Sequence, residues 1–130
     1  MAKQKKRIQP TDAELEILQV IWENGPSTVR FVNDQLNKKK HTGYTTTLKL
    51  MQIMNEKGIL NRKVDGRVHT YNSVLDEETT QSIVVDKMLN LAFGGSASKL
   101  VLQALGNKST TPDELKKIKQ LIAELEKKGQ

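Results

Sequence analysis

The sequence predicts a mainly α-helical protein with one small β-hairpin, built as an N-terminal module of three helices and a hairpin and a C-terminal module of three helices. Apolar residues recur at helical spacing in six segments, and two β-branched runs flank Asp65-Gly66. The positive charge is also uneven. Residues 1–75 hold 13 Lys and Arg against 7 Asp and Glu, whereas residues 76–130 hold 8 of each. We therefore expect two domains, 1–75 and 76–130.

The first helix is expected to begin at Thr11, because Thr11 and Glu14 have the spacing of a capping box ahead of an apolar run. Gly25-Pro26 ends it. We interpret Asp12, Glu14 and Glu16 as surface acids that suit the positive end of the helix dipole. The residues predicted to face the core are Leu15, Leu18, Ile21 and Trp22, with Trp22 as a packing anchor.

The second helix is expected to be capped by Ser27 and to carry Val29, Val32 and Leu36 inward. It runs out in Lys38-Lys39-Lys40. That run is interpreted as a solvated helix end that complements the dipole, with phosphate contact as the alternative. The basic start, residues 1–7, is likewise a solvated tail or an arm that touches phosphate.

The third helix is predicted from Tyr44 to Met54, and Gly58 stops it. One side is apolar at helical spacing: Thr47, Leu50, Met51 and Met54. The other side carries Thr45, Thr46, Lys49 and Gln52. Hydroxyls, an ammonium and an amide can bond phosphate oxygens and base edges in a major groove. This pattern predicts a recognition helix.

A hairpin follows, in which residues 59–64 and 68–74 flank Asp65-Gly66, a dipeptide that supplies the positive φ of a tight turn. Three helices followed by a basic hairpin form the winged version of the helix-turn-helix unit. The alternative is a helix and wing that serve only as a protein interface. The candidate DNA-binding residues are Tyr44, Thr45, Thr46, Lys49, Gln52, Arg62, Lys63 and Arg67.

The C-terminal module is expected to open at Asp76-Glu77-Glu78 with a helix that is apolar nearly all round. Gly94-Gly95-Ser96 breaks it, a shorter helix runs to Gly106-Asn107, and a third begins at Thr111-Pro112. About 55 residues cannot cover so much apolar surface, so a second copy is expected to cover it. The candidate dimerisation residues are Ile83, Met88, Leu89, Phe93, Leu100, Val101, Leu115, Ile118, Leu121, Ile122 and Leu125.

The residue types that carry catalysis or bind metals are scarce. There is no cysteine, and His41 and His69 have no carboxylate partner at ligand spacing, so we expect no metal, no cofactor and no enzymatic activity. Gly94-Gly95 lies between helices and not after a strand, unlike a phosphate-binding loop. No apolar run of about 18 residues and no signal sequence is present, so a cytoplasmic protein without membrane insertion is expected.

Four segments carry a resemblance to a known family. They are residues 11–18 with Trp22 shortly after, residues 43–54, residues 56–58 and residues 93–96. In order and spacing they resemble the penicillinase repressor family, the BlaI/MecI type of bacterial transcription regulators. The resemblance covers nearly the whole chain.

The resemblance implies a homodimer with N-terminal winged domains and interlocked C-terminal helices that represses transcription by occupying a dyad operator. It also implies that positions Thr45, Thr46 and Lys49 face DNA, and that the regulated genes often include a membrane-bound sensor protease. Copper-responsive relatives end in a cysteine-rich motif, which is absent here. β-Lactam-responsive members are cut at an Asn-Phe bond, and the matching residues 102–105 contain neither residue.

The sequence thus predicts a dimeric winged-helix repressor that binds duplex operator DNA. A competing hypothesis is a regulator in which the C-terminal helices enclose a small hydrophobic ligand. Such a pocket is usually lined by aromatic side chains, and Phe93 is the one aromatic residue in that half of the sequence.

Overall fold

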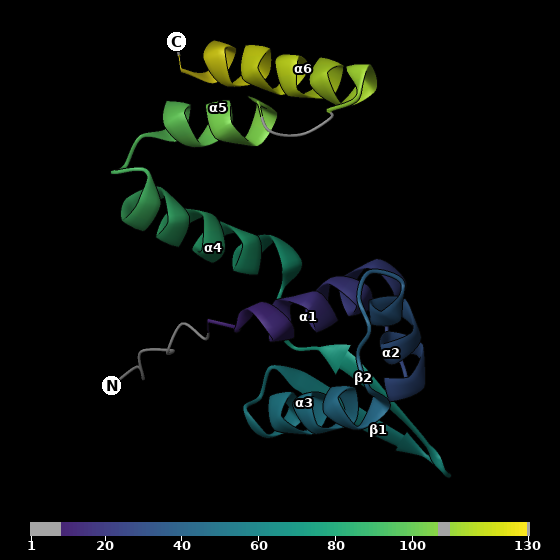
Figure 1. Cartoon of the computed structure of the whole chain (residues 1–130). Helices are drawn as coiled ribbons and strands as arrows, with labels where there is room; N and C mark the ends of the chain where they lie inside the picture. Colours follow the sequence, from purple (N-terminus) through teal and green to yellow (C-terminus); the bar gives the residue numbers. More distant parts are fainter. Residues whose placement is uncertain (1–8, 107–109, 130) are drawn as a thin grey trace. The chain divides into compact units, whose positions relative to one another are not determined.

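The computed structural model describes residues 9–106 and 110–129 and forms six helices and one two-stranded sheet in that part of the chain (Figure 1). The mainly helical fold with a hairpin wing is confirmed. The elements are α1 (Asp12–Asn24), α2 (Val29–Asn37), α3 (Tyr44–Glu56), β1 (Leu60–Asp65), β2 (Val68–Ser73), α4 (Glu77–Ala92), α5 (Ala97–Gly106) and α6 (Pro112–Lys128). The basic start, residues 1–7, and Asn107 lie outside the described residues.

The chain divides into two compact units, residues 1–85 and 86–130. The division falls within α4. None of the helices in the described part of the chain is long and apolar enough to cross a membrane.

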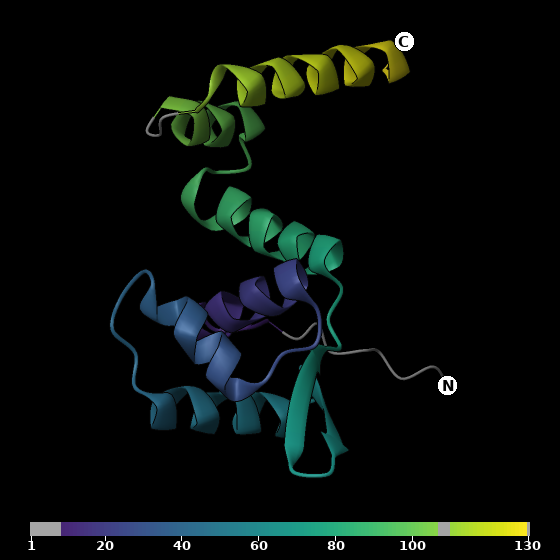
Figure 2. The same ribbon diagram turned by 90° about the vertical axis from the view of Figure 1, so that its right-hand side faces the viewer.

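In the first unit, α1, α2, α3 and the hairpin lie side by side (Figures 1 and 2). One apolar core is buried among them. Each helix contributes side chains at helical spacing, which is why each sequence stripe becomes one buried side. The buried apolar residues are Ile17, Leu18, Ile21, Val29, Val32, Met51, Met54, Ile59, Leu60 and Tyr71. The expected core residues Leu15, Trp22, Leu36 and Leu50 are partly buried against it.

Of two predicted helix starts, one is confirmed and the other is wrong. The capping box is confirmed, because Glu14 N–H donates to Thr11 Oγ1 (3.2 Å) and Thr11 N–H donates to Glu14 Oε1 (2.9 Å). The Ser27 cap is wrong. Thr28 caps α2 by accepting from Phe31 N–H (3.1 Å). Ser27, one residue earlier, is buried, and its backbone pairs with Tyr71 of the hairpin.

The hairpin turn lies one residue later than predicted. Asp65 pairs with Val68 across the antiparallel ladder, so the loop consists of Gly66 and Arg67. Gly66 has φ +62° and is the only one of the two with positive φ, which is the arrangement of a type II′ turn. The positive-φ glycine was identified correctly, but its place in the turn depends on the strand register.

In the second unit, α6 has the predicted cap, since Thr111 Oγ1 accepts from Glu114 N–H (3.1 Å) and Pro112 opens the helix. Gly94 and Gly95 separate α4 from α5 as expected. No described residue of α5 or α6 is buried. Several large apolar side chains are exposed: Met88, Leu91, Val101, Leu102, Leu115, Leu121, Ile122 and Leu125. The burial expected all round α4 is therefore not reached within one chain.

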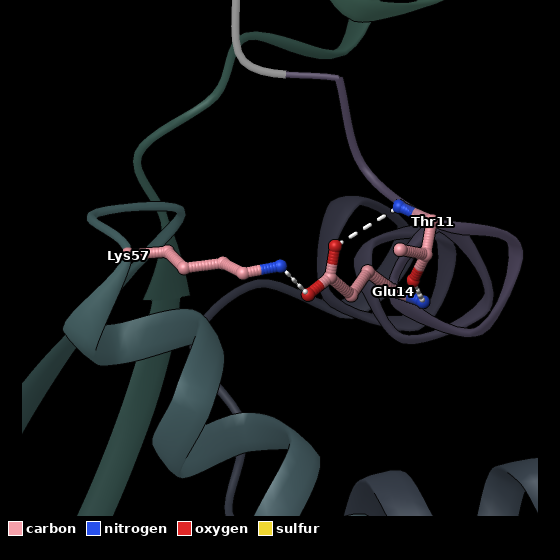
Figure 3. A network of polar contacts seen from close by, with 3 residues as sticks. All are labelled: Thr11, Glu14 and Lys57. Atoms are coloured by element: carbon pink, nitrogen blue, oxygen red, sulfur yellow. Dashed lines mark hydrogen bonds and ion pairs between the residues drawn. The ribbon is translucent and has the colours of Figure 1, made fainter.

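Of the three acids Asp12, Glu14 and Glu16, Glu14 is the one for which the surface interpretation is wrong, because its side chain is only 2% exposed. Lys57 Nζ, at the end of α3, lies 2.8 Å from Glu14 Oε2 (Figure 3). Burial by itself raises the pKa of Glu14, but the hydrogen bonds from Lys57 and from the Thr11 N–H outweigh it and hold the pKa below its ordinary value. The carboxylate therefore caps α1 and ties it to α3.

We predict that Glu14→Gln lowers the free energy of unfolding by about 1–2 kcal/mol at pH 7, where the ion pair between the buried carboxylate and the half-exposed Lys57 is lost but a neutral cap remains. The folded pKa is depressed, so the stabilisation is present above the ordinary value of 4.5 and disappears as the pH falls through the folded pKa. Urea unfolding from pH 7 to pH 3 should show the parent and variant converging on the acid side.

Glu16→Gln is the matched control on the same helix, because Glu16 is half exposed and its ion pair with Lys40 is long, at 3.9 Å. Its effect should stay below about 0.5 kcal/mol. A Glu14→Gln difference that is independent of pH would rule out the ion pair as its cause.

Candidate nucleic-acid interface

The two sides of α3 are sorted by burial. Thr47, Met51 and Met54 are fully buried against the core. The opposite side is exposed and carries the predicted residues Thr45, Thr46, Lys49 and Gln52. The helix therefore presents two hydroxyls, an ammonium and an amide to solvent on a rigid support.

A buried polar contact fixes the start of α3 against α2. The amide of Asn33, which is 8% exposed, donates to Thr47 Oγ1 (2.8 Å) and to the Thr42 carbonyl (3.0 Å). Thr47 in turn donates to the Gly43 carbonyl (3.4 Å). Both side chains are thus satisfied without water, and the contact sets how the two helices cross.

The turn between these helices is fixed by a second asparagine. Asn37 Nδ2 donates to the Thr42 carbonyl (2.9 Å), while Thr42 N–H donates back to Asn37 Oδ1 (3.0 Å). Asn37 also donates to the Asn33 carbonyl (2.8 Å). The turn of the helix-turn-helix is therefore held by side-chain amides that imitate backbone partners.

The end of α3 is tied to the wing. Ile59 N–H donates to the Met54 carbonyl (2.9 Å) and Gly58 N–H to the Asn55 carbonyl (3.2 Å) around Gly58 at φ +82°, which is a Schellman motif. Asn55 Oδ1 then accepts from Arg62 N–H (3.2 Å). The position of β1 is thus set by the last turn of the helix.

The base of the wing is anchored to the first half of the domain. Ser27 and Tyr71 exchange two backbone hydrogen bonds, 2.8 and 3.0 Å long. Trp22 Nε1 lies 3.1 Å from Ser73 Oγ and 3.1 Å from the Leu75 carbonyl, to both of which it donates. Trp22 is the packing anchor that was predicted, and it also fastens the end of β2.

The basic residues of the wing are exposed but do not share one face. Arg62 pairs with Tyr71, whereas Lys63 pairs with Thr70. Because side chains alternate along a strand and paired residues share a face, Arg62 lies on the side of the buried Tyr71 and Lys63 on the opposite side. The prediction treated Arg62 and Lys63 as one basic group, but the strand register places them on opposite faces of the hairpin.

A hollow of about 530 Å³ lies where α2, α3 and the wing meet. It is lined by Thr28, Val29, Arg30, Tyr44, Leu48, Gln52, Arg62, Arg67, Val68, His69 and Tyr71. Its lining contains three arginines and no Asp or Glu. The predicted residues Tyr44, Gln52, Arg62 and Arg67 are brought together there. Thr45, Thr46, Lys49 and Lys63 are exposed outside its lining.

Arg30 was not predicted. Its guanidinium carbon lies 5.2 Å from the centroid of the Tyr44 ring, which is a cation–π contact between α2 and the first residue of α3. The sequence held a signal for it. Arg30 follows the buried Val29 and falls outside the apolar stripe of α2, so it had to point away from the core.

Among the described residues, no three of His, Asp and Glu lie close enough together to hold a metal ion. His69 is exposed on the wing, as predicted. Uncompensated arginines beside polar helix residues suit a polyanionic partner.

Residues 10–124 match the profile of the penicillinase repressor family. The chain belongs to this family. It is 29% identical to the penicillinase repressor of Bacillus licheniformis over 92% of this chain and 94% of that protein. It is 26% identical to the transcriptional regulator BlaI of Mycobacterium tuberculosis over 88% and 83%. The family consists of transcriptional repressors and not of enzymes.

Two solved structures support the fold. The DNA-binding domain of the repressor BlaI superposes with a TM-score of 0.50 at 34% identity, covering 57% of this chain and 90% of that domain. A MarR family protein from Bacillus stearothermophilus superposes with a TM-score of 0.53 at 20% identity, covering 93% and 76%. The first unit is therefore a winged helix.

We predict that Asn33→Ala lowers the free energy of unfolding by about 1–3 kcal/mol, because the buried Thr47 hydroxyl loses its donor and the Thr42 carbonyl keeps only the donor from Asn37. Thr47→Val removes the other partner. In a double-mutant cycle the two losses should not add, since they break the same contact. Urea unfolding at one protein concentration measures this, and strictly additive losses would show that Asn33 and Thr47 are not coupled.

Proposed function

We propose that this chain is a homodimeric repressor that binds a two-fold symmetric operator in duplex promoter DNA. One observation carries the proposal: the polar, exposed side of α3 lies next to an arginine-lined hollow without acids, in a chain of the penicillinase repressor family. In this proposal α3 enters the major groove and the wing lies along the backbone. Promoter DNA of a bacterium lies in the cytoplasm, so the repressor acts there.

Within the interface we assign different tasks to the helix and the wing. Thr45, Thr46, Lys49 and Gln52 are exposed on one side of α3, which suits contact with base edges. Lys63 and Arg67 lie on the wing, where cations neutralise phosphates irrespective of sequence.

We propose residues 1–75 as the DNA-binding domain and residues 76–130 as the dimerisation domain. The support is the apolar surface of the second part. Leu121 is 55%, Leu125 57% and Leu102 70% exposed, and exposed apolar groups of this number mark an interface. The charges divide in the same way, because all the net positive charge lies in residues 1–75.

Dimerisation would also be the control point. Separated protomers would each keep one half-site and lose the affinity gained by linking two sites. We propose a protein partner, such as a sensor protease, that cuts or displaces residues 76–130. Following the intact mass of the chain together with operator occupancy in stressed host cells distinguishes cutting from displacement.

The DNA prediction separates the two tasks. Thr46→Ala or Lys49→Ala should reduce discrimination among operator variants by about 1–3 kcal/mol, because a base contact is lost. Lys63→Ala or Arg67→Ala should weaken binding to all sequences alike and lower the salt slope by about 1 for each protomer of the dimer. Titration of labelled duplexes at several salt concentrations measures both.

Lys87→Ala, which removes an exposed cation from the second unit, is the control for net charge and should change neither quantity. If wing variants alter base preference while helix variants do not, the recognition element has been assigned to the wrong segment.

The dimer prediction concerns the α6 stripe. Leu121→Glu should convert the dimer into monomers, because a charge would have to be buried in an apolar interface. Light scattering at micromolar concentration gives the mass of the parent, of Leu121→Glu and of a fragment ending at Val74. A monomeric parent, or a fragment that still dimerises, would refute the assignment. Glu124→Gln, on an exposed charged position of α6, is the control and should stay dimeric.

A further inference from the structure

Arg30 and Tyr44 form an exposed stack that lies outside the hydrophobic core. Tyr44 is 42% exposed, and Arg30 is also exposed, so the contact buries little apolar surface. The guanidinium nevertheless lies 5.2 Å from the ring centroid, between the first turn of α2 and the first residue of α3. A solvent-exposed arginine that is held by a ring has lost much of the rotamer freedom it would otherwise have. This geometry prepares Arg30 for a contact outside the domain.

Among the described residues, Arg30 takes part in no ion pair. The ion pairs among the described residues are Glu14 with Lys57 and Glu16 with Lys40, and neither involves an arginine. The hollow that Arg30 lines also holds Arg62 and Arg67 but no carboxylate. Three guanidinium groups that share one hollow repel each other, so the unliganded arrangement favours the entry of an anion.

The chemistry of the lining indicates which anion. A guanidinium presents a planar fork of donors that matches two oxygens of a phosphate group. The three arginines come from three elements, namely α2, β1 and the turn of the wing, and Gln52 of α3 lines the same hollow. In a helix-turn-helix the helix before the recognition helix crosses the DNA backbone. The hollow thus lies between α2 and the wing, the elements that are expected to flank one DNA strand.

We propose that this hollow holds a backbone phosphate of one DNA strand beside the major groove, that Arg30 contacts this phosphate together with Arg62 and Arg67, and that Tyr44 positions Arg30. The inference rests on the proposed function. It adds Arg30 as a DNA-contacting residue and assigns the ring of Tyr44 as a support for the guanidinium and not as a reader of bases.

The test is the salt dependence of binding for the full chain. Each phosphate contact contributes about 0.9 to the slope of log affinity against log salt. In the proposed dimer Arg30→Ala removes one such contact from each protomer, so it should lower the slope by about 1.8, and the ratio of parent to variant affinity should shrink by about 12-fold between 50 and 200 mM salt. The loss should be equal for operator and unrelated duplexes. Lys87→Ala, which changes the net charge equally, should leave the slope as it is.

The role of Tyr44 has its own readout. Tyr44→Leu removes the ring and should weaken binding to all sequences, whereas Tyr44→Phe retains the ring and should bind like the parent. In an Arg30→Ala background, Tyr44→Leu should cause no further loss, because a positioning residue has no effect without the residue that it positions. Thermal unfolding of each variant verifies the fold, which exposed positions should tolerate.

Each other outcome overturns the inference. An unchanged salt slope in Arg30→Ala, with operator binding intact, excludes the phosphate contact while the proposed function stands. A change in base preference with an unchanged slope makes Arg30 a base reader. Losses from Arg30→Ala and Tyr44→Leu that add fully exclude the positioning role. A parent that binds no duplex DNA removes the proposed function and this inference together.

Discussion

The structure of the N-terminal unit depends on one constraint: α3 must bury one side completely and keep the other side free. Polar contacts with the buried side chains Asn33 and Glu14 hold α3 at both ends. Asn33 bonds to Thr47 near its start at 2.8 Å, and Glu14 pairs with Lys57 at its end at 2.8 Å. Between these points the fully buried Met51 lies in the core. Because both contacts are satisfied inside the domain, they fix the helix without using its outward side chains.

The same helix also determines the position of the wing. Asn55 near the end of α3 bonds to the backbone of Arg62, and the backbone of Tyr71 pairs with Ser27. The hairpin is thus fastened on both strands, and the arginine-lined hollow lies between elements that are fixed relative to each other. Preorganised cations lose less entropy on binding than mobile ones. A fixed hollow that contains Arg30 and lacks acids is therefore suited to hold a phosphate of the DNA strand.

The helices of the C-terminal unit differ from those of the N-terminal unit in how little they bury. Its helices have clear starts and stops, as at Thr111, yet α5 and α6 bury no described residue in one chain. Local signals such as caps stabilise single helices, whereas burial needs enough surrounding chain. The apolar stripe that includes Leu121 and Leu125 is exposed for this reason. We propose a second copy of the chain as the partner that covers this stripe.

The sequence by itself determined the order of elements, the capping box at Thr11, the stop at Gly58 and the two sides of α3, because caps and helical periodicity act over a few residues. Tertiary structure decided what depends on distant residues. Glu14 was expected at the surface, but Lys57 lies 43 positions away in the chain and makes its burial possible. The strand register separated Arg62 from Lys63 and moved the turn by one residue. The Arg30–Tyr44 stack required the crossing of α2 and α3, which no local pattern encodes.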